Sequence, residues 1–238
     1  MTWAHPRLYR PFGILRKRRD CLAEDFDVWI EGFPRSANTF AAKSFLAANP
    51  GAKVRSHMHL PPFVIHAHHS GKPGMLLLRC PESAALSWAA FWNARIAGCL
   101  DYYVDYHRAL LSIAPELFIV RFDDAIQHFD KVMHRFNAHF GTAYAPMVHN
   151  EQTLANCFAE MDRMQVEWRG FVDEMRVCHP SAKRTTVIEQ LRSQLHKSPR
   201  LERKLRAANE IYRAILRQVP HPVLQEDKVS TQELPSLS

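Results

Sequence analysis

The sequence predicts a three-layer α/β fold in which a central parallel β-sheet is flanked by helices and followed by a helical C-terminal part. Between residues 27 and 141, short apolar runs alternate with helical segments four times, which is typical of βαβ units in a parallel sheet. The 238 residues, 47% of them hydrophobic, suffice for one sizeable core. We therefore expect a basic leader (1–25), a single domain (26–219) and a flexible tail (220–238).

Four strands are expected, at about residues 27–32, 53–59, 75–79 and 117–122. The first is a short continuous apolar run of the kind that is buried on both faces of a parallel sheet. Proline and glycine positions delimit the helices between them. The expected helices cover about residues 36–48, a short segment that ends at 71, and then 82–95, 102–113 and 125–140.

The C-terminal part has a different character from the alternating segments. Residues 142–155 look irregular, and the rest of the chain to about residue 218 has a helical pattern with breaks near 179–180 and 198–199. We expect the tail to be mobile because it is polar and contains proline.

Charge and cysteine content restrict the partners and the compartment. The formal net charge is +7, from 31 basic and 24 acidic residues, and this excess suits a polyanionic ligand. The five cysteines are scattered and form no C-x-x-C pair, which indicates neither a disulfide framework nor a cysteine-rich zinc site. No apolar stretch is long enough to span a bilayer. We expect a cytoplasmic protein without a transmembrane segment.

Candidate site residues follow the expected strands, because ligands of open parallel sheets bind beyond the carboxyl ends of the strands. The residues at these positions are Pro34, Arg35, Ser36, Asn38 and Thr39 after the first strand, His57 and His59 after the second, Arg79 with Ser83 and Ser87 after the third, and Asp123 and Asp124 after the fourth. Many of these side chains are of types that bind phosphate, and the histidines are candidate bases.

The segment between the first strand and the first helix predicts an anion site. A buried strand leads through a Gly-Phe-Pro turn to a helix, whose unpaired N–H groups and positive dipole end attract phosphate or sulfate. Ala37-Asn38-Thr39 would overlay the Gly-Lys-Thr of a nucleoside-triphosphate loop, but the lysine is missing. Arg35 supplies the cation instead.

Four segments resemble the sulfotransferases that use 3′-phosphoadenosine 5′-phosphosulfate (PAPS). Residues 33–40, FPRSANTF, are similar to the 5′-phosphosulfate-binding loop of that family. Residues 79–87, RCPESAALS, are similar to its 3′-phosphate motif, an arginine at the end of the third strand and a serine eight residues later. His59-Leu60-Pro61 resembles the segment that carries the catalytic histidine in the cytosolic branch, and Phe122-Asp123-Asp124 resembles the Tyr-Glu-Asp segment. The four matches follow the family's order.

The resemblance implies a P-loop-like fold and in-line transfer of a sulfuryl group from PAPS to a hydroxyl of a carbohydrate, lipid or other small-molecule acceptor. The product nucleotide would be 3′,5′-adenosine bisphosphate. His59 would be the catalytic base, Arg35 would stabilise charge on the leaving phosphate, and no metal or nucleic acid would be needed. The residues implied in donor binding are Pro34, Arg35, Ser36, Ala37, Asn38, Thr39, Phe40, Arg79 and Ser87.

Several positions depart from the family pattern and leave alternatives open. Ala37 replaces the usual glycine, and its Cβ fits only if the turn needs no positive φ there. Phe40 is either an adenine platform or core. The base is His59, or His57, which precedes it by two residues on the same face of the expected strand, or a carboxylate, Glu31 or Asp123.

Other parts of the sequence also carry more than one interpretation. The aromatic series Trp88, Phe91 and Trp92 has helical spacing and is either core or a wall of the acceptor pocket. A C-terminal group could close over the 3′-phosphate or form a solvated helix surface; it consists of Ser198, Arg200, Arg203 and Lys204. The histidines between residues 57 and 69 could suggest a metal site, but no carboxylate or cysteine interleaves with them.

Two other classes of function compete with the transferase. The first is a P-loop kinase or nucleotidase, for which the loop lysine is absent and Asp123 would have to bind Mg²⁺. The second is a non-catalytic protein that binds nucleic acid or another polyanion through its basic surface, although clustered RNA- or DNA-binding motifs are missing.

Overall fold

The computed structural model of the chain describes residues 25–148, 150–177 and 181–218. The predicted basic leader, apart from its last residue, lies outside these residues, as do residue 219 and the whole predicted tail. None of the helices in the described part is long and apolar enough to cross a bilayer.

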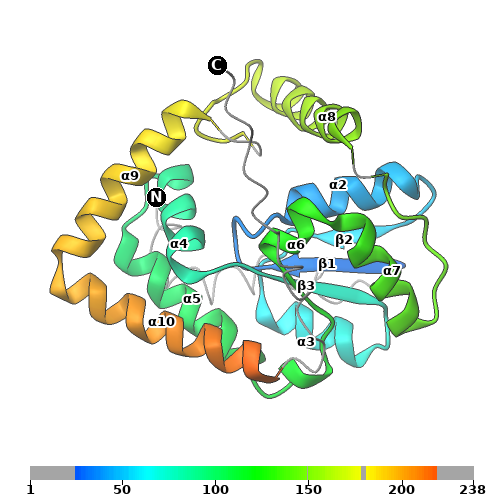
Figure 1. Cartoon of the computed structure of the whole chain (residues 1–238), viewed down its shortest axis with the longest axis horizontal. Coiled ribbons are helices and arrows are strands. Elements are labelled where there is room, and N and C mark those ends of the chain that lie inside the picture. The colour runs from blue at the N-terminus through cyan, green and yellow to red at the C-terminus, as the bar shows by residue number, and fades with distance from the viewer. Residues whose placement is uncertain (1–24, 149, 178–180, 219–238) are drawn as a thin grey trace, which may run out of the picture.

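A four-stranded parallel sheet forms the centre of the described structure, with the order β2-β1-β3-β4 (Figure 1). Its strands are β1 (Val28–Gly32), β2 (Val54–Ser56), β3 (Gly74–Leu78) and β4 (Ile119–Arg121). The registers place Ile30 beside Ser56 and Gly32 beside Leu77. The carboxyl ends of the strands therefore meet at one edge of the sheet, as predicted from the alternating pattern.

Both faces of the sheet are buried, because successive residues of a strand point to opposite sides. Val28, Ile30 and Met75 belong to the apolar cluster on one face, and Trp29 and Leu76 belong to the cluster on the other. This burial on both sides explains why the strands read as continuous apolar runs rather than as alternating ones.

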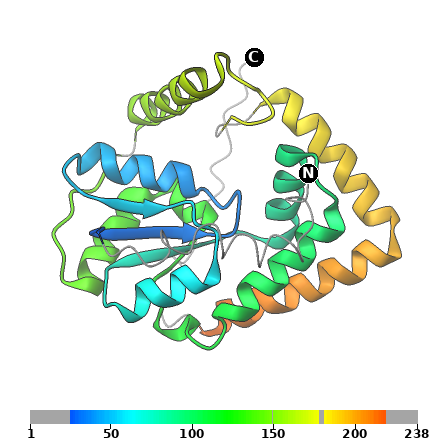
Figure 2. The ribbon, with the colours of Figure 1, turned by 180° about the vertical axis from the view of Figure 1, so that it is seen from behind.

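Helices from different parts of the chain cover the two faces and complete three layers (Figure 2). On the Val28 face lie α2 (Asn38–Ala48), α6 (Phe122–Gln127) and α7 (Phe129–Phe140). On the Trp29 face lie α3 (Pro61–His69), α4 (Pro81–Trp92) and α5 (Ile96–Leu110). The predicted fold class is confirmed.

Gly74 at the start of β3 is a point where backbone and side chain meet too closely for any Cβ. A Cβ there would lie 2.0 Å from Cε2 of Trp29. We expect Gly74→Ala to lower the free energy of unfolding by about 1–3 kcal/mol, the usual cost of overpacking a core. Gly51→Ala is the matched control, since its added Cβ meets nothing within 4 Å. Equal urea midpoints for the two variants would contradict this packing.

Several expected elements differ from the observed ones. The helix expected at 102–113 begins already at Ile96, and residues 151–155, expected to be irregular, are helical. The second strand ends at Ser56 rather than at residue 59, so His57 and His59 lie in the loop after it. The helix expected over residues 125–140 is two helices, α6 and α7, because the backbone of His128 leaves helical geometry at φ −142°. Helix α8 (Glu151–Arg169) ends at Gly170, which has a φ of 81°, and the break expected at residues 179–180 lies outside the described residues.

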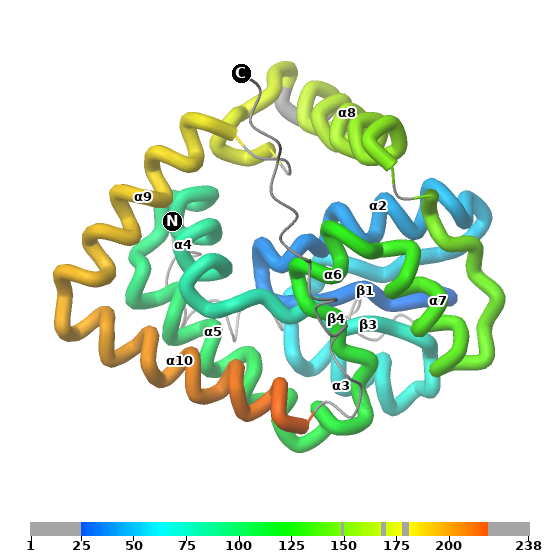
Figure 3. Tube along the Cα trace, viewed as in Figure 1, coloured from blue at the N-terminus to red at the C-terminus, as the bar shows by residue number. Residues whose placement is uncertain are grey.

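The C-terminal helices surround the sheet layers on two sides (Figure 3). Helix α8 packs against α2, and its Cys157 and Met161 form a third apolar cluster with Phe40. Helix α9 (Ala182–Lys197) packs against α4, and α10 (Pro199–Gln218) packs against α5. The chain thus returns from α8 to the side of the sheet where α4 begins.

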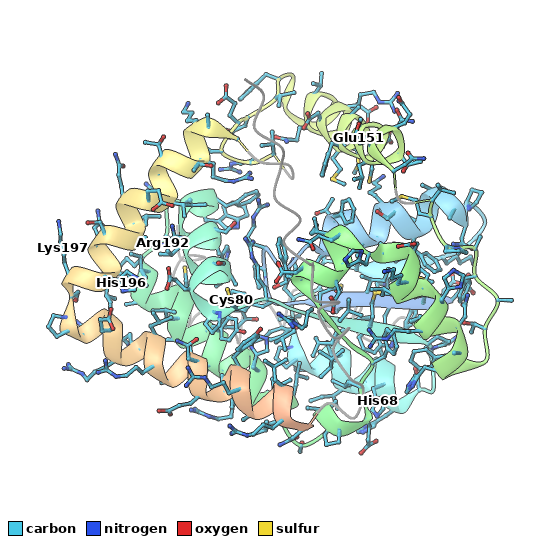
Figure 4. The ribbon with its side chains drawn as sticks, in the orientation of Figure 1. His68, Cys80, Glu151, Arg192, His196 and Lys197 are labelled. Carbon is cyan, nitrogen blue, oxygen red and sulfur yellow. The ribbon has the colours of Figure 1, made fainter. Side chains whose placement is uncertain are left out.

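Ion pairs fix α9 on α4. Arg192 Nε lies 2.8 Å from Glu82 Oε1, and His196 lies 3.6 Å from the other oxygen of the same carboxylate. A second carboxylate, Glu202 on α10, accepts from His196 at 2.6 Å and keeps the pKa of that imidazole above its usual value. Figure 4 shows Arg192 and His196 together on this part of α9. The position of α9 matters because its first turn carries Arg184.

Candidate active site

The loop that joins β1 to α2 has an unusual backbone for its sequence. Arg35 and Ala37 have φ values of 68° and 70°, in the left-handed region, while Ser36 between them has a negative φ. Alternation of this kind turns successive N–H groups toward one point and forms an anion-binding concavity. The first turn of α2 adds its own unpaired N–H groups to the same end of the loop. The local backbone is therefore suited to a phosphate or sulfate.

Ala37 has a positive φ, although its Cβ was expected to fit only if the turn needed none. The turn requires a positive φ at this position, and alanine adopts it as the N-cap of α2. The left-handed conformation costs a residue with a Cβ roughly 1–2 kcal/mol. Four of the five non-glycine residues with positive φ in the described chain belong to this site: Arg35, Ala37, His57 and His59. Such clustering of strain is typical of functional sites.

Arg79 connects the loop with the end of β3. Its Nη1 donates a hydrogen bond to the backbone carbonyl of Arg35 at 2.7 Å. The Arg35 side chain in turn crosses to α4 and donates from Nε to Ser87 Oγ at 3.3 Å. The two predicted anion motifs, residues 33–40 and 79–87, are thus in direct contact at the sheet edge. Cys80, labelled in Figure 4, marks the point where the chain leaves β3 for α4.

The surroundings of Arg79 disfavour the charged form of its guanidinium. Burial lowers the pKa of the Arg79 guanidinium, and the nearby charge of Arg184 lowers it further, although Cys80 and Asp123 act in the opposite direction. The guanidinium lies over the ring of Phe122, 4.0 Å from its centroid. Its Nε finds no hydrogen-bond partner in the described part of the chain. An anion at this place would offset the desolvation of the cation.

The first turn of α9 and the segment before it contribute two arginines that the sequence did not single out. Arg184, only 8% exposed, donates through Nη1 to the Val177 carbonyl. The same carbonyl accepts from Arg35 Nη2 at 3.2 Å. Arg176 lies over the rings of Phe91 and Trp92, at 5.4 and 4.9 Å from their centroids. No motif marks these residues, because tertiary packing alone brings them to α4.

His59 lies in the loop after β2 with one ring nitrogen committed. Its Nδ1 is 2.8 Å from the carbonyl oxygen of Gly32, and a carbonyl can only accept, so Nδ1 carries the proton. In the neutral ring Nε2 is then the unprotonated nitrogen, the form that a general base needs. The side chain remains 18% exposed. Tyr102 holds the backbone here by donating to the His59 carbonyl at 2.6 Å.

Glu31, the penultimate residue of β1, supports this loop. Its two carboxylate oxygens accept from the backbone N–H groups of Met58, at 2.7 Å, and His59, at 3.0 Å. The carboxylate is fully buried, and one of its oxygens lies 4.0 Å from His59 Nδ1. A charge in this position favours the imidazolium that forms when a base takes up a proton. Its contacts suit a supporting group for His59 better than a base.

His57 and His59 are not equivalent, contrary to the expectation that they share one strand face. His57 Nε2 lies 2.9 Å from Thr39 Oγ1, and its Nδ1 lies 2.6 Å from Ser56 Oγ. The two imidazole rings meet edge to face with centroids 5.8 Å apart. Each histidine therefore has its own partners, one on the α2 side and one on the β1 side.

The remaining loop residues mainly shape the turn. Ser36 is buried, and its backbone N–H donates to the Phe33 carbonyl at 3.2 Å. Asn38 is buried as well and donates from Nδ2 to the same carbonyl at 3.1 Å. Pro34 lies buried between Phe33 and Arg35. These contacts fix the conformation of the loop.

The structure places several candidates outside the site. Phe40 is buried with Phe129 and Phe158, at centroid distances of 6.4 and 5.9 Å, which is a core position rather than an adenine platform. Asp123 has a side chain that is 66% exposed and faces Arg121 at 4.0 Å.

The structure also shows where the aromatic series and the basic C-terminal group lie. Trp88 is half-buried, Phe91 lies beneath the Arg35 guanidinium at 4.6 Å, and Trp92 is 57% exposed. A uniform core role is therefore wrong for this series. In the C-terminal group, Lys204 pairs with Asp101, and Arg200 and Arg203 are exposed on α10.

The histidines between residues 57 and 69 form no ligand set. In the part of the chain that the structure describes, no three His, Cys, Asp or Glu side chains are grouped to hold a metal ion. His68, at the end of α3, instead pairs with Glu116 at 3.0 Å.

Comparisons with known proteins complete the description of the site. No family model matches the chain, and no curated protein matches it. Among solved structures, the chain is similar to the crystal structure of mouse sulfotransferase SULT7A1 complexed with PAP. The two share 13% sequence identity and a TM-score of 0.44, over 82% of this chain and 93% of that chain.

Proposed function

We propose that this protein is a sulfotransferase that moves the sulfuryl group of PAPS to a hydroxyl of a carbohydrate, lipid or other small-molecule acceptor. The observation that carries the proposal is the contact between the two anion motifs, in which Arg79 binds the carbonyl of Arg35 and Arg35 binds Ser87. A nucleotide with phosphates at both its 5′ and 3′ positions needs two adjacent anion sites. The ordered motifs in residues 33–40 and 79–87 supply them.

The roles of the residues follow from their positions. The N–H groups around the first turn of α2, with Thr39, would hold the 5′-phosphosulfate, and Arg79 and Ser87 would hold the 3′-phosphate. Arg35 would stabilise charge on the leaving phosphate, but it must first leave its contacts with Ser87 and Val177. A long arginine side chain can make this move without a change in the backbone.

The transfer itself requires no covalent intermediate. The acceptor oxygen forms a bond to sulfur while the bond between sulfur and the 5′-phosphate oxygen breaks. Nε2 of His59 takes the acceptor proton, and the released electron pair stays on the phosphate of 3′,5′-adenosine bisphosphate. Positioning and charge stabilisation then account for most of the catalysis, as in phosphoryl transfer.

The two competing classes fit the site less well. A P-loop kinase needs a loop lysine and a carboxylate for Mg²⁺, and the loop carries Arg35 while the side chain of Asp123 is exposed and faces Arg121. A polyanion-binding protein needs an extended basic surface, and a half-buried Arg79 whose charge is penalised by burial does not offer one.

A thermal shift experiment separates these classes. We expect 3′,5′-adenosine bisphosphate at about 100 times its dissociation constant to add roughly 2.7 kcal/mol to the free energy of unfolding. ATP with Mg²⁺ and a mixed-sequence oligonucleotide at the same concentration should shift the melting temperature much less. Equal stabilisation by Mg-ATP would favour the kinase class, and stabilisation by the oligonucleotide alone would favour the polyanion class.

If the bisphosphate binds, a second experiment identifies the acceptor by measuring transfer of labelled sulfate. The assay would offer PAPS with a panel that contains a phenol, a steroid alcohol, a long-chain alcohol and a sugar. Appearance of the label in one acceptor supports the transferase. Bisphosphate binding without transfer to any acceptor or to water would contradict it.

A further inference from the structure

We propose that His57 is a positioning residue that orients the hydroxyl of Thr39 toward the 5′-phosphate of the bound nucleotide. The inference rests on the proposed function, because it assigns a role within the same site. It starts from a chain of three hydrogen-bonding side chains, Ser56, His57 and Thr39, which runs from the end of β2 to the first turn of α2.

The backbone at His57 is strained in a way that the chain of contacts explains. His57 has a φ of 64°, a conformation that costs a non-glycine residue roughly 1–2 kcal/mol. With this left-handed turn directly after β2, the imidazole ring of His57 contacts Thr39 through one nitrogen and Ser56 through the other. The preceding strand residue, Ser56, is itself held in the sheet beside Ile30. The ring is thus held between two fixed elements.

Thr39 is the second residue of α2, where the unpaired N–H groups of the helix point at the predicted anion. Its hydroxyl has one proton to donate, and the direction of that proton depends on what its oxygen accepts. When His57 donates from Nε2, Thr39 Oγ1 accepts that bond, and the hydroxyl proton is free for a phosphate oxygen. When Thr39 instead donates to Nε2, no proton remains for the anion.

Ser56 allows the productive arrangement. Its hydroxyl can donate to His57 Nδ1 across 2.6 Å, which places the proton of a neutral imidazole on Nε2. The order of donation is then Ser56 to His57, His57 to Thr39, and Thr39 to the phosphate. His57 therefore has a task different from that of His59, whose Nδ1 donates to the Gly32 carbonyl and whose Nε2 is the proposed proton acceptor.

Binding affinities test this role without knowledge of the acceptor. The variants are His57→Asn, whose residue type tolerates positive φ, Thr39→Val, which removes the hydroxyl at nearly constant shape, and the double variant. Calorimetry would measure 3′,5′-adenosine bisphosphate and, as the control, adenosine 3′-monophosphate, which lacks the 5′-phosphate. Each single variant should bind the bisphosphate about 10-fold more weakly, as expected for one hydrogen bond to a charged group.

The double variant and a conservative replacement distinguish positioning from general structural support. We expect the double variant to bind no more weakly than Thr39→Val alone, because His57 acts through Thr39. His57→Gln should recover most of the affinity, because its side chain is one methylene longer than that of asparagine and can bring the amide donor closer to Thr39. None of the variants should change affinity for the 3′-monophosphate by more than about twofold, within the usual error of independent sites.

Three results would overturn the inference while leaving the proposed function intact. They are additive losses in the double variant, an equal loss of affinity for both nucleotides, and unchanged bisphosphate affinity in His57→Asn. If the unaltered protein binds neither nucleotide, the proposed function fails, and the role of His57 fails with it. The two failures are therefore distinguishable.

Discussion

Replacement of His59 by asparagine is expected to lower kcat by a factor of about 10²–10⁴, the usual contribution of a positioned general base. Asparagine is the informative choice because His59 has a φ of 51° and asparagine tolerates this backbone better than most residues. The loss follows from the geometry of the ring, whose Nδ1 bonds Gly32 and leaves Nε2 for the acceptor proton. Labelled sulfate transfer from PAPS to the acceptor selected by the panel measures it.

The same variant should leave binding of the nucleotide nearly intact. His59 lies in the loop between β2 and α3 and bonds the carbonyl of Gly32 at the end of β1. The proposed donor contacts come from other residues, namely 35–39, Arg79 and Ser87, so we expect affinity for 3′,5′-adenosine bisphosphate to change by no more than about twofold. His68→Asn is the matched control, since His68 pairs with Glu116 at the far end of α3, and it should retain full turnover. Lost nucleotide binding in the His59 variant would make that residue structural rather than catalytic.

Replacement of Arg79 by alanine is expected to remove the preference for a 3′-phosphate. The unaltered protein should bind 3′,5′-adenosine bisphosphate about 100-fold more tightly than adenosine 5′-monophosphate, which corresponds to roughly 2.7 kcal/mol for a buried charge pair. In Arg79→Ala the two affinities should become similar. Calorimetric titration of both nucleotides measures the ratio, which is more informative than either affinity alone because general damage to the fold lowers both.

Arg200→Ala supplies the control for Arg79. Arg200 belongs to the C-terminal basic group that the sequence offered as an alternative cover for the 3′-phosphate, and it is exposed on α10. We expect its replacement to change the affinity ratio by less than about twofold, as for other exposed charges. If Arg200→Ala removes the preference and Arg79→Ala does not, the 3′-phosphate lies on the C-terminal helices instead.

The sequence was informative wherever one local rule decided the structure. Continuous apolar runs identified the strands, and the rule that ligands bind beyond parallel strands selected Arg35, His59, Arg79 and Ser87 before any coordinates were known. The structure brings Arg35, Arg79 and Ser87 into contact. These residues could be selected because each lies within a few positions of a strand end.

The sequence was uninformative where tertiary packing overrides local preference. Residues other than glycine adopt positive φ uncommonly, so the sequence raised a left-handed backbone only as a condition on Ala37 and did not predict it at His57. The second strand ends at Ser56 rather than at residue 59, and beyond it the backbone N–H groups of Met58 and His59 bond the Glu31 carboxylate instead of a neighbouring strand. Arg184 reaches Val177 only through the return of α9 to α4, which no sequence motif marks.

The central claim is that residues 33–40 and 79–87 form one site for one nucleotide, and a crystal structure of the complex with 3′,5′-adenosine bisphosphate tests it most directly. The account predicts the 5′-phosphate at the first turn of α2, within about 3 Å of Thr39 Oγ1, and the 3′-phosphate at a similar distance from Arg79 and Ser87. A nucleotide that contacts only one of the two segments, or that binds elsewhere, would contradict the account.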